Sequence, residues 1–247
     1  MKRVSWMLPV VAGAVVLAYG LVVADVAMPR DKWSPIRLVS EDVNIVLGAS
    51  KVTVEATFNL KNEKDAVKAV IGYPRGMLEE SLNDFTVTVD GKPVEVTSQE
   101  GRKGDRPRMG VVPGRKKDGP LKSAYQFAGA YPEWKTFEVS FATKGKRKVV
   151  VKYHVKPAEV ETEENGKLLT YVYTMQTGAT WLGNIDKASI RAKLDGLSEA
   201  DIVTTTPRMD VRKASAAGAP LVWTFEDFKP TQDIEITFRP PTAQAKK

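Results

Sequence analysis

The chain has 247 residues, a formal net charge of +7, 43% hydrophobic residues and 27% charged residues. These proportions are typical of a globular protein and exclude wholesale disorder and collagen-like structure. Cysteine is absent, and histidine occurs once, at His154. The sequence therefore excludes disulfide frameworks, thiol nucleophiles, a lipid-modified N-terminal cysteine and metal sites built from thiolates or several histidines. We expect no cofactor.

The N-terminus has the pattern of an export signal or a membrane anchor. Lys2 and Arg3 precede an almost uncharged stretch, residues 4–24, which is rich in Val, Ala, Leu and Gly. This stretch is long for a signal peptide and just long enough to span a bilayer as a helix, and 22–24 offers a small-residue cleavage site. Residues 1–24 are therefore predicted to be a signal peptide or a retained hydrophobic helix. In both cases residues 25–247 lie outside the cytoplasm, in the periplasm, in the extracellular space or anchored at the membrane.

The rest of the chain is dominated by alternation with a period of two residues. It is clearest at 51–62, where apolar residues at every second position are separated by polar ones, as in a strand with one wet face. Turn sequences stand at 48–50, 90–91 and 144–146, and the Asp90-Gly91 pair predicts a tight hairpin. Short helical turns are expected at 77–82 and 198–201. Further strands are expected at 42–47, 67–73, 85–89, 94–97, 136–142, 148–155, 168–175, 188–194, 221–225 and 234–238.

Many short strands at regular spacing predict an all-β fold with antiparallel β-sandwich architecture. We expect two lobes, residues 30–100 and 124–241, with a polar tail at 242–247; a single large sandwich is the alternative. The turn at 144–146 is expected to join a hairpin.

A basic segment, residues 101–123, is expected to connect the two lobes as a flexible loop. It carries eight basic residues against two acidic ones and so supplies the net positive charge of the exported part. A long connection of this kind is either solvated and flexible or functional, and its charge would attract an anionic surface. The candidate contacts with an anionic partner are Arg102, Lys103, Arg106, Arg108, Arg115, Lys116, Lys117 and Lys122.

Several motifs point to a family. Residues 58–62 read Phe-x-x-x-Asn, a strand ends at Pro74, and residues 85–92 read F-T-V-T-V-D-G-K. This order resembles an uncharacterised exported bacterial β-domain family and, more distantly, the vault/inter-α-trypsin (VIT) domain. Two tryptophan-containing segments, 177–185 and 223–236, are similar to signatures of the same exported proteins.

The resemblance implies a scaffolding or interaction module with no known reaction. VIT domains often accompany a von Willebrand A domain, but the Asp-x-Ser-x-Ser metal motif of that domain does not occur in this sequence. A metal-dependent adhesion role is therefore not implied.

Candidate catalytic groups are few. His154 is the one conventional general base at neutral pH, and alternation places it on the less apolar face of its strand, at the surface. Asp233 and Glu235 share the predicted wet face of a strand and, with Glu226 and Asp227, form the candidate carboxylate site for glycoside hydrolysis. The acidic run at 159–164 lacks the spacing of a calcium loop and is expected to be a solvated hairpin tip.

Aromatic residues offer a second kind of candidate site. Trp181 and Trp223 are most simply core residues, with Trp181 held by a glycine-rich turn. Alternatively, Trp181 faces a ligand from a loop. Tyr131 and Trp134 follow the basic segment, and with Trp181 they are the candidate aromatic contacts.

The sequence therefore predicts an exported, non-enzymatic interaction or structural module at the bacterial cell envelope. Its expected partner is an anionic lipid, a wall polymer or an acidic protein, and nucleic acid is not expected because the chain is exported. A carbohydrate- or anionic-polymer-binding protein is the alternative, and a carboxylate-dependent envelope hydrolase is the least favoured hypothesis.

Overall fold

The computed structural model describes residues 35–75, 81–100, 133–162, 165–209 and 219–241, and the backbone of Val23–Ala24. All but two short 3-10 turns of the regular structure in these ranges is β-strand, which confirms the predicted all-β class. The hydrophobic helix predicted at 4–24 lies outside the described residues apart from Val23–Ala24, which form the short strand β1. In the ranges that the structure covers, no helix has the length and apolar character of a membrane span.

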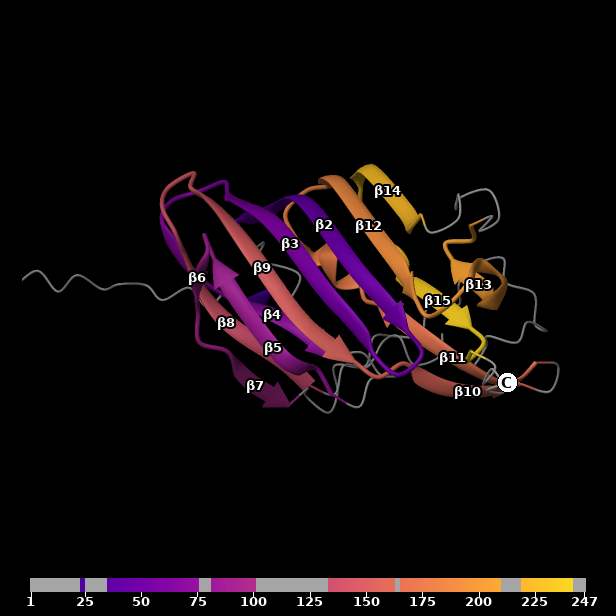
Figure 1. The fold of residues 1–247 in the computed structure, drawn as a ribbon. Coiled ribbons are helices and arrows are strands. Elements are labelled where there is room, and N and C mark those ends of the chain that lie inside the picture. The colour runs from indigo at the N-terminus through magenta and orange to yellow at the C-terminus, as the bar shows by residue number, and fades with distance from the viewer. Residues whose placement is uncertain are drawn as a thin grey trace, which may run out of the picture.

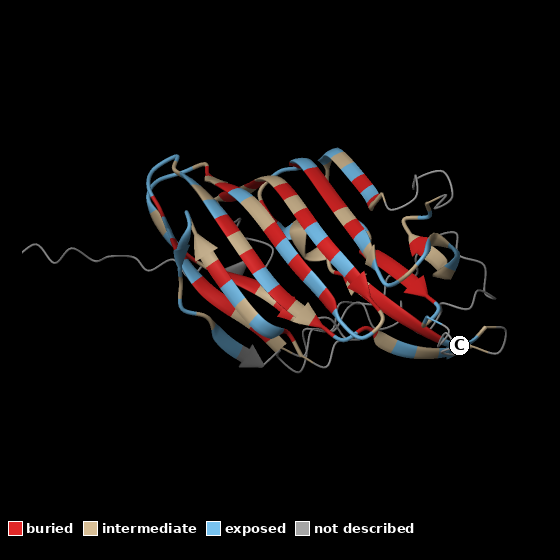
Figure 2. Cartoon of the chain, viewed as in Figure 1, coloured by how far each residue is buried: buried red, intermediate tan, exposed pale blue. Residues whose placement is uncertain are grey.

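The largest sheet, sheet B, has seven strands in the order β14-β12-β2-β3-β9-β5-β6 (Figure 1). Its pairs are antiparallel except that β12 runs parallel to β2. Buried and exposed residues alternate along its long strands, as the striped ribbons of Figure 2 show. The strands are β2 (Ile36–Gly48), β3 (Val52–Asn62), β5 (Asn83–Val89), β6 (Lys92–Pro93), β9 (Lys146–Val155), β12 (Ile185–Asp195) and β14 (Leu221–Phe228).

Two four-stranded sheets complete the fold, and in the view of Figure 1 sheet A lies behind sheet B while sheet C extends beyond it to the right. Sheet A has the order β1-β4-β8-β7, and sheet C has the order β10-β11-β15-β13. One cluster of buried apolar side chains includes residues of all three sheets, so the architecture is a β-sandwich. The remaining strands are β4 (Val67–Arg75), β7 (Thr97–Glu100), β8 (Glu133–Phe141), β10 (Ala158–Thr162), β11 (Gly166–Tyr173), β13 (Ile202–Thr206) and β15 (Ile234–Phe238).

The hairpin predicted around residues 144–146 is wrong. β8 pairs with β4 in sheet A, whereas β9 pairs with β3 and β5 in sheet B, so the turn carries the chain from one layer to the other. Alternation and a glycine turn are the same for a hairpin and for such a crossing, because both join two amphipathic strands.

The chain passes between sheets B and A twice, from β3 to β4 and from β8 to β9, and hydrogen bonds of Asn62 join these two connections. The connection from β3 to β4 contacts the connection from β8 to β9, with Asn62 N donating to Gly145 O at 2.9 Å. The fully buried Asn62 amide donates to Asp65 O and Ala142 O at 2.6 and 3.0 Å. The buried side chain of the Asn in the Phe-x-x-x-Asn motif therefore finds hydrogen-bond partners in the backbone of both connections.

The two predicted lobes share their sheets. β3 and β4 precede the basic segment and pair with β9 and β8, which follow it. The predicted boundary at residues 101–123 therefore does not separate sheets, and the alternative of one large sandwich describes this pairing.

Other local predictions agree with the structure. The turn at 48–50 joins β2 to β3, and Asp90 and Gly91 both have positive φ, as a type I′ hairpin requires. Residues 199–201 form a 3-10 turn, η2, with Ser198 and Asp201 as a capping box. The strand predicted at 94–97 is replaced by Lys92–Pro93, which stays in sheet B, and Thr97–Glu100, which joins sheet A. The turn predicted at 77–82 lies mostly outside the described residues.

Candidate functional site

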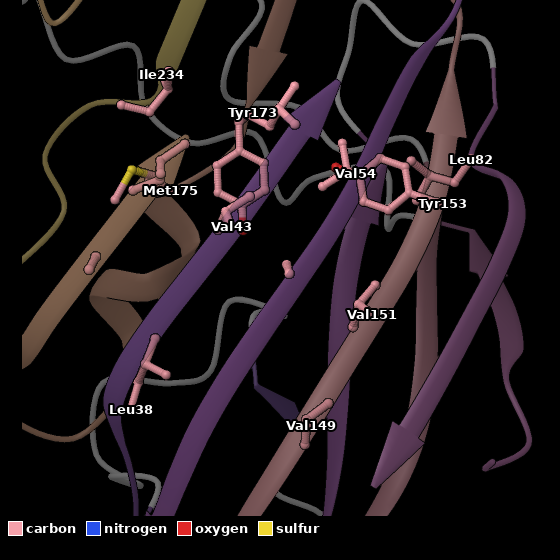
Figure 3. Packing of buried hydrophobic residues seen from close by; sticks show 14 of the residues in the cluster. Leu38, Val43, Val54, Leu82, Val149, Val151, Tyr153, Tyr173, Met175 and Ile234 are labelled. Carbon is pink, nitrogen blue, oxygen red and sulfur yellow. The ribbon is translucent and has the colours of Figure 1, made fainter. Parts of the chain in front are cut away.

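A mostly apolar pocket lies where the three sheets meet. Its volume is about 50 Å³, and side chains of sheets A, B and C and of the 3-10 turn η1 (Gln176–Thr180) line it. Figure 3 shows part of this region, with the ring of Tyr173 over β2, close to Val43. The described lining residues are Leu38, Glu41, Phe58, Leu60, Ile71, Gly72, Tyr73, Pro74, Phe137, Val149, Val151, Tyr173, Thr174, Met175, Thr177, Gly178 and Trp181.

Glu41 reaches the pocket because β2 contains a β-bulge. Leu38 pairs with Leu60 of β3, and Ser40 pairs with the next residue, Asn59, so Val39 is an extra residue in β2. The insertion shifts the alternation by one position, and the buried side of β2 continues at Glu41 rather than Ser40. Bulges often redirect a side chain in this way.

Glu41 is 6% exposed and accepts a hydrogen bond on its Oε1 from the hydroxyl of Tyr173 at 2.6 Å. Burial raises the pKa of the Glu41 carboxyl from 4.5 to about 7, although the Tyr173 hydrogen bond acts in the opposite direction. Burial, with the nearby Glu41 carboxyl, raises the pKa of the Tyr173 phenol well above its usual value. The pair is therefore a phenol that stays protonated and a carboxyl that ionises near neutrality.

A cluster of tyrosines stands beside this pair and joins the three sheets. The hydroxyl oxygens of Tyr73 in β4 and Tyr153 in β9 are 2.9 Å apart, and that of Tyr153 is 3.4 Å from Tyr171 in β11. The ring of Phe85 in β5 contacts the rings of Tyr73 and Tyr153, with centroids 5.5 and 6.1 Å away. Buried hydroxyls that bond one another can be kept inside an apolar core, and here they fix the relative position of the sheets.

Asp233 holds the wall of the pocket that η1 forms. Its Oδ1 accepts the backbone N–H groups of Met175 and Gln176 at 2.8 and 2.9 Å, and its Oδ2 accepts the Gln176 amide at 3.2 Å. Burial raises the pKa of this carboxyl, and the hydrogen bonds from Gln176 and Met175 oppose that effect. Farther along, Lys229 Nζ donates to Ala179 O and Trp181 O at 3.0 and 3.2 Å. Asp233 and Lys229 thus fix the segment that carries Thr177, Gly178 and Trp181.

Of the two predicted aromatic contacts that the structure describes, Trp181 lines this pocket and Trp134 does not. Trp181 is 8% exposed and belongs to the apolar core, as does Trp223, which confirms the core interpretation of Trp223. Trp134 is 7% exposed, and alternation along β8 places it on the face opposite Phe137. Trp134 and Trp181 therefore do not form an exposed stacking surface. Tyr131 lies outside the described residues.

The predicted anion-binding residues of the basic segment also lie outside the described residues. The structure does describe the residues on both sides of 101–132, the range that includes this segment, and there Glu100 in β7 pairs with Glu133 in β8. The segment therefore connects two neighbouring antiparallel strands of sheet A. Close to this point Arg75 and Lys135 bind the Glu133 carboxylate at 3.2 and 2.6 Å, which lowers its pKa, chiefly through Lys135.

The predicted catalytic candidates do not come together. His154 is partly exposed and its Nδ1 lies 3.4 Å from the carboxylate of Asp84, which agrees with the predicted surface position. The predicted wet face for Asp233 and Glu235 is wrong: both are 2% exposed. Asp233 immediately precedes β15, and every residue of β15, including Glu235, is buried. Glu159 and Glu161 are exposed on the β10–β11 hairpin. Among the described residues, no group of acidic and histidine side chains could hold a metal ion.

Sequence reasoning missed Glu41 and Tyr173. Glu41 looks like a solvent-facing residue between Ser40 and Asp42, and nothing in the sequence marks the bulge. A weak signal was available in residues 168–175, whose almost unbroken run of apolar and aromatic residues predicts burial of Tyr173 on a strand.

Comparisons with known proteins show a fold and no family. No family model matches the chain, and no curated protein matches it. A solved structure from Legionella pneumophila, described as a "putative nutrient binding protein", is similar with a TM-score of 0.56 and 15% identity, over 84% of this chain and 68% of that one. At this identity the likeness shows the fold alone.

A second solved structure, an M1 zinc metallopeptidase from Deinococcus radiodurans, has a TM-score of 0.39 and 9% identity, and 83% of this chain spans 42% of that protein. It supports no conclusion about this protein. The resemblance to the VIT domain stays a prediction.

Proposed function

We propose that this protein is an exported, non-enzymatic binding module that takes up a small ligand, or one small group of a larger partner, in the pocket between its three sheets. The observation that carries this proposal is the position of Glu41. A β-bulge turns an acidic side chain into a largely apolar cavity, where one hydroxyl bonds it. A few polar groups in an otherwise apolar concavity are typical of small-molecule sites.

Two further observations support a binding role at the envelope. The similar structure from Legionella pneumophila is described as a "putative nutrient binding protein", which is in keeping with binding. Lys2 and Arg3 followed by the apolar stretch at 4–24 have the pattern of export. The predicted VIT-like role as an interaction module belongs to the same class.

The chemistry of the pocket favours binding over hydrolysis. Glu41 is paired with the phenol of Tyr173, and glycoside hydrolysis needs two carboxyl groups facing one another across the substrate. Asp233 is fully engaged in holding η1. The carboxylate-dependent hydrolase is therefore the least supported alternative.

A ligand screen with a blocked pocket tests this proposal. The protein, expressed with its own N-terminus and purified from the envelope fraction, would be screened against small metabolites for a rise in melting temperature, with Kd then measured by calorimetry. Thr177→Phe introduces a ring at the pocket wall, and Thr231→Phe makes the same change at an exposed position. We expect binding that Thr177→Phe abolishes and Thr231→Phe preserves. Binding that is unaffected by Thr177→Phe, or no binding at all, would contradict the proposal.

A second candidate function is electrostatic attachment to an anionic partner through residues 101–123. The observation that favours it is the excess of six positive charges in this segment, which lies within the connection 101–132 between the paired strands β7 and β8. Lipid headgroups, acidic wall polymers and acidic proteins all present the negative charge that such a segment would attract.

Replacing Arg102, Lys103, Arg106, Arg108, Arg115, Lys116 and Lys117 with Ser tests this second function. Binding to anionic vesicles and to an anionic polysaccharide would be measured over a salt series for both forms. We expect binding that weakens with salt and is lost in the Ser variant, because exposed charges are screened. If neither form binds, the segment is a solvated connection.

A further inference from the structure

We propose that the pocket recognises the ammonium group of a small organic cation, with Glu41 as its counter-ion. This inference rests on the proposed function, since it names the class of ligand that the same pocket takes.

Among the residues that the structure describes around the pocket, none places a cation beside the Glu41 carboxyl. None of the described lining residues is basic, and the other lining groups that titrate are the phenols of Tyr73 and Tyr173. On the neighbouring strands of sheet B, Phe58 and Ala188 stand opposite Glu41 and carry no charge. A buried carboxylate is stable when a cation pairs with it, and here a ligand has to supply that cation.

The walls are suited to a cation in a second way. Five of the lining residues are aromatic, and they come from β3, β4, β8, β11 and the end of η1. An ammonium group close to the face of an aromatic ring is attracted by the negative charge of the ring face, and this attraction is stronger where water is excluded. A carboxylate ligand, in contrast, would be repelled by Glu41. The aromatic residues are Phe58, Tyr73, Phe137, Tyr173 and Trp181.

The size of the cavity limits the group that can enter. About 50 Å³ is available, and roughly 10–15 Å³ of such volume holds one water molecule, so the pocket has room for a few non-hydrogen atoms. A primary ammonium on a short aliphatic body fits this room, as does the ammonium end of a longer amine whose remainder stays outside. A bulky quaternary ammonium does not.

Glu41 and Tyr173 could instead serve only to connect sheets B and C. A purely structural pair would give no preference between a cation, a neutral molecule and an anion of the same shape. The charge of the ligand therefore separates the two explanations, and three probes of nearly equal size make the comparison: n-butylammonium, n-butanol and butyrate.

The experiment measures the binding of these probes to the full-length protein by calorimetry and by NMR chemical-shift changes between pH 5 and pH 8. We expect n-butylammonium to bind at least tenfold more tightly than n-butanol at pH 8, and butyrate not to bind. The Glu41 carboxyl has to lose its proton before it can pair with the cation. Since its pKa is raised to about 7, the affinity for n-butylammonium should rise about tenfold per pH unit up to that pKa and then level off.

Glu41→Gln keeps the shape of the side chain and removes its charge. It should weaken n-butylammonium binding roughly 10- to 100-fold, the usual range for a hydrogen bond to a charged group, and should abolish the pH dependence. The matched control is Glu55→Gln in β3, where the exposed glutamate pairs with Lys152 on the outer face of sheet B. This control should bind as the unaltered protein does, and melting curves of both variants check that they are folded.

The outcomes separate the two proposals. If all three probes bind equally, or if Glu41→Gln has no effect, the preference for a cation is wrong and the pocket remains a binding site of another specificity. If none of the probes binds but the ligand screen gives binding that Thr177→Phe abolishes, the cation inference again fails while the proposed function holds. The pH profile of the unaltered protein decides the matter even if Glu41→Gln does not fold.

Discussion

The hydroxyl of Tyr173 donates a hydrogen bond of 2.6 Å to the carboxyl of Glu41, a residue 132 positions earlier in the chain. Tyr173 lies in sheet C and Glu41 in sheet B, so this bond connects two layers of the sandwich at the edge of the pocket. Both side chains are almost fully buried, so each is the main polar neighbour of the other.

Tyr173→Phe removes this bond and leaves the ring in place. We expect the free energy of unfolding to fall by about 1–3 kcal/mol, because a buried carboxyl then loses its donor. Urea unfolding at pH 6 measures the change. The exposed pair of Lys152 and Glu55 provides a comparison, and Lys152→Met should change the stability by less than about 1 kcal/mol. An unchanged stability in Tyr173→Phe would show that the bond contributes nothing.

Stability should fall as the pH rises from 4.5 to 7 because of Glu41. In this interval the folded protein keeps the Glu41 proton, whereas the unfolded chain has lost it, since the pKa is about 7 in the folded state and 4.5 otherwise. The contribution of Glu41 to the free energy of unfolding is fully present below pH 4.5 and is lost as the pH rises through 7. The loss is about 1.4 kcal/mol per pH unit and about 3 kcal/mol in total.

Other carboxyls also have shifted pKa values and contribute to the pH dependence of stability, so the effect of Glu41 has to be isolated by difference. Burial also raises the pKa of Asp233, while salt bridges and hydrogen bonds lower those of Glu63, Glu133, Glu159 and Asp201. Urea unfolding of the unaltered protein and of Glu41→Gln would be compared at half-unit steps of pH. The unaltered protein should lose stability relative to the variant as the pH rises, and parallel curves would contradict the assigned pKa.

The strands were largely predictable from the sequence, but their partners were not. Residues 234–238 form β15 with the predicted bounds, and 51–62 differ by one residue from β3. Ile202–Thr206, β13, was missed because its burial does not alternate clearly, so the period-two signal is weak. The parallel pairing of β2 with β12 joins segments far apart in the chain, and no local pattern encodes such a contact.

The pocket was hidden from sequence reasoning for related reasons. The bulge at Val39 shifts the buried side of β2, and Glu41 faces the core only because of that shift. Asp233 and Glu235 follow the alternation of a strand with one wet face, but Asp233 is buried and so is every residue of β15. In both cases the alternation of apolar and polar residues predicts that a strand forms, but the packing of the sheets determines which of its faces is buried.

Asp233→Ala should destabilise the protein and loosen the pocket wall. Two backbone N–H groups, of Met175 and Gln176, would lose their acceptor, which costs about 1–3 kcal/mol for each buried group left unsatisfied. We therefore expect a loss of about 2–5 kcal/mol in urea unfolding. Asp233→Asn keeps one acceptor oxygen and should cost less. Equal stability of all three proteins would show that η1 does not depend on this carboxylate.

Trp181 and Trp134 should behave as core residues when they are truncated. Each is less than 9% exposed, so replacement by Ala leaves a cavity and should cost about 3–5 kcal/mol of the free energy of unfolding. An exposed stacking residue would cost far less. Thermal melts of both Ala variants, with the exposed Val222→Ala as the control, distinguish the two situations.

The most direct test of the account is the pKa of Glu41 itself, measured by ¹³C NMR of the side-chain carboxyl with and without saturating n-butylammonium. We predict a pKa of about 7 in the free protein. We also predict that this pKa falls by at least about one unit with the cation, because a ligand that binds the ionised form tenfold more tightly lowers the pKa by that amount. A pKa that n-butylammonium leaves unchanged would contradict the claim that Glu41 is the polar centre of a cation-binding pocket.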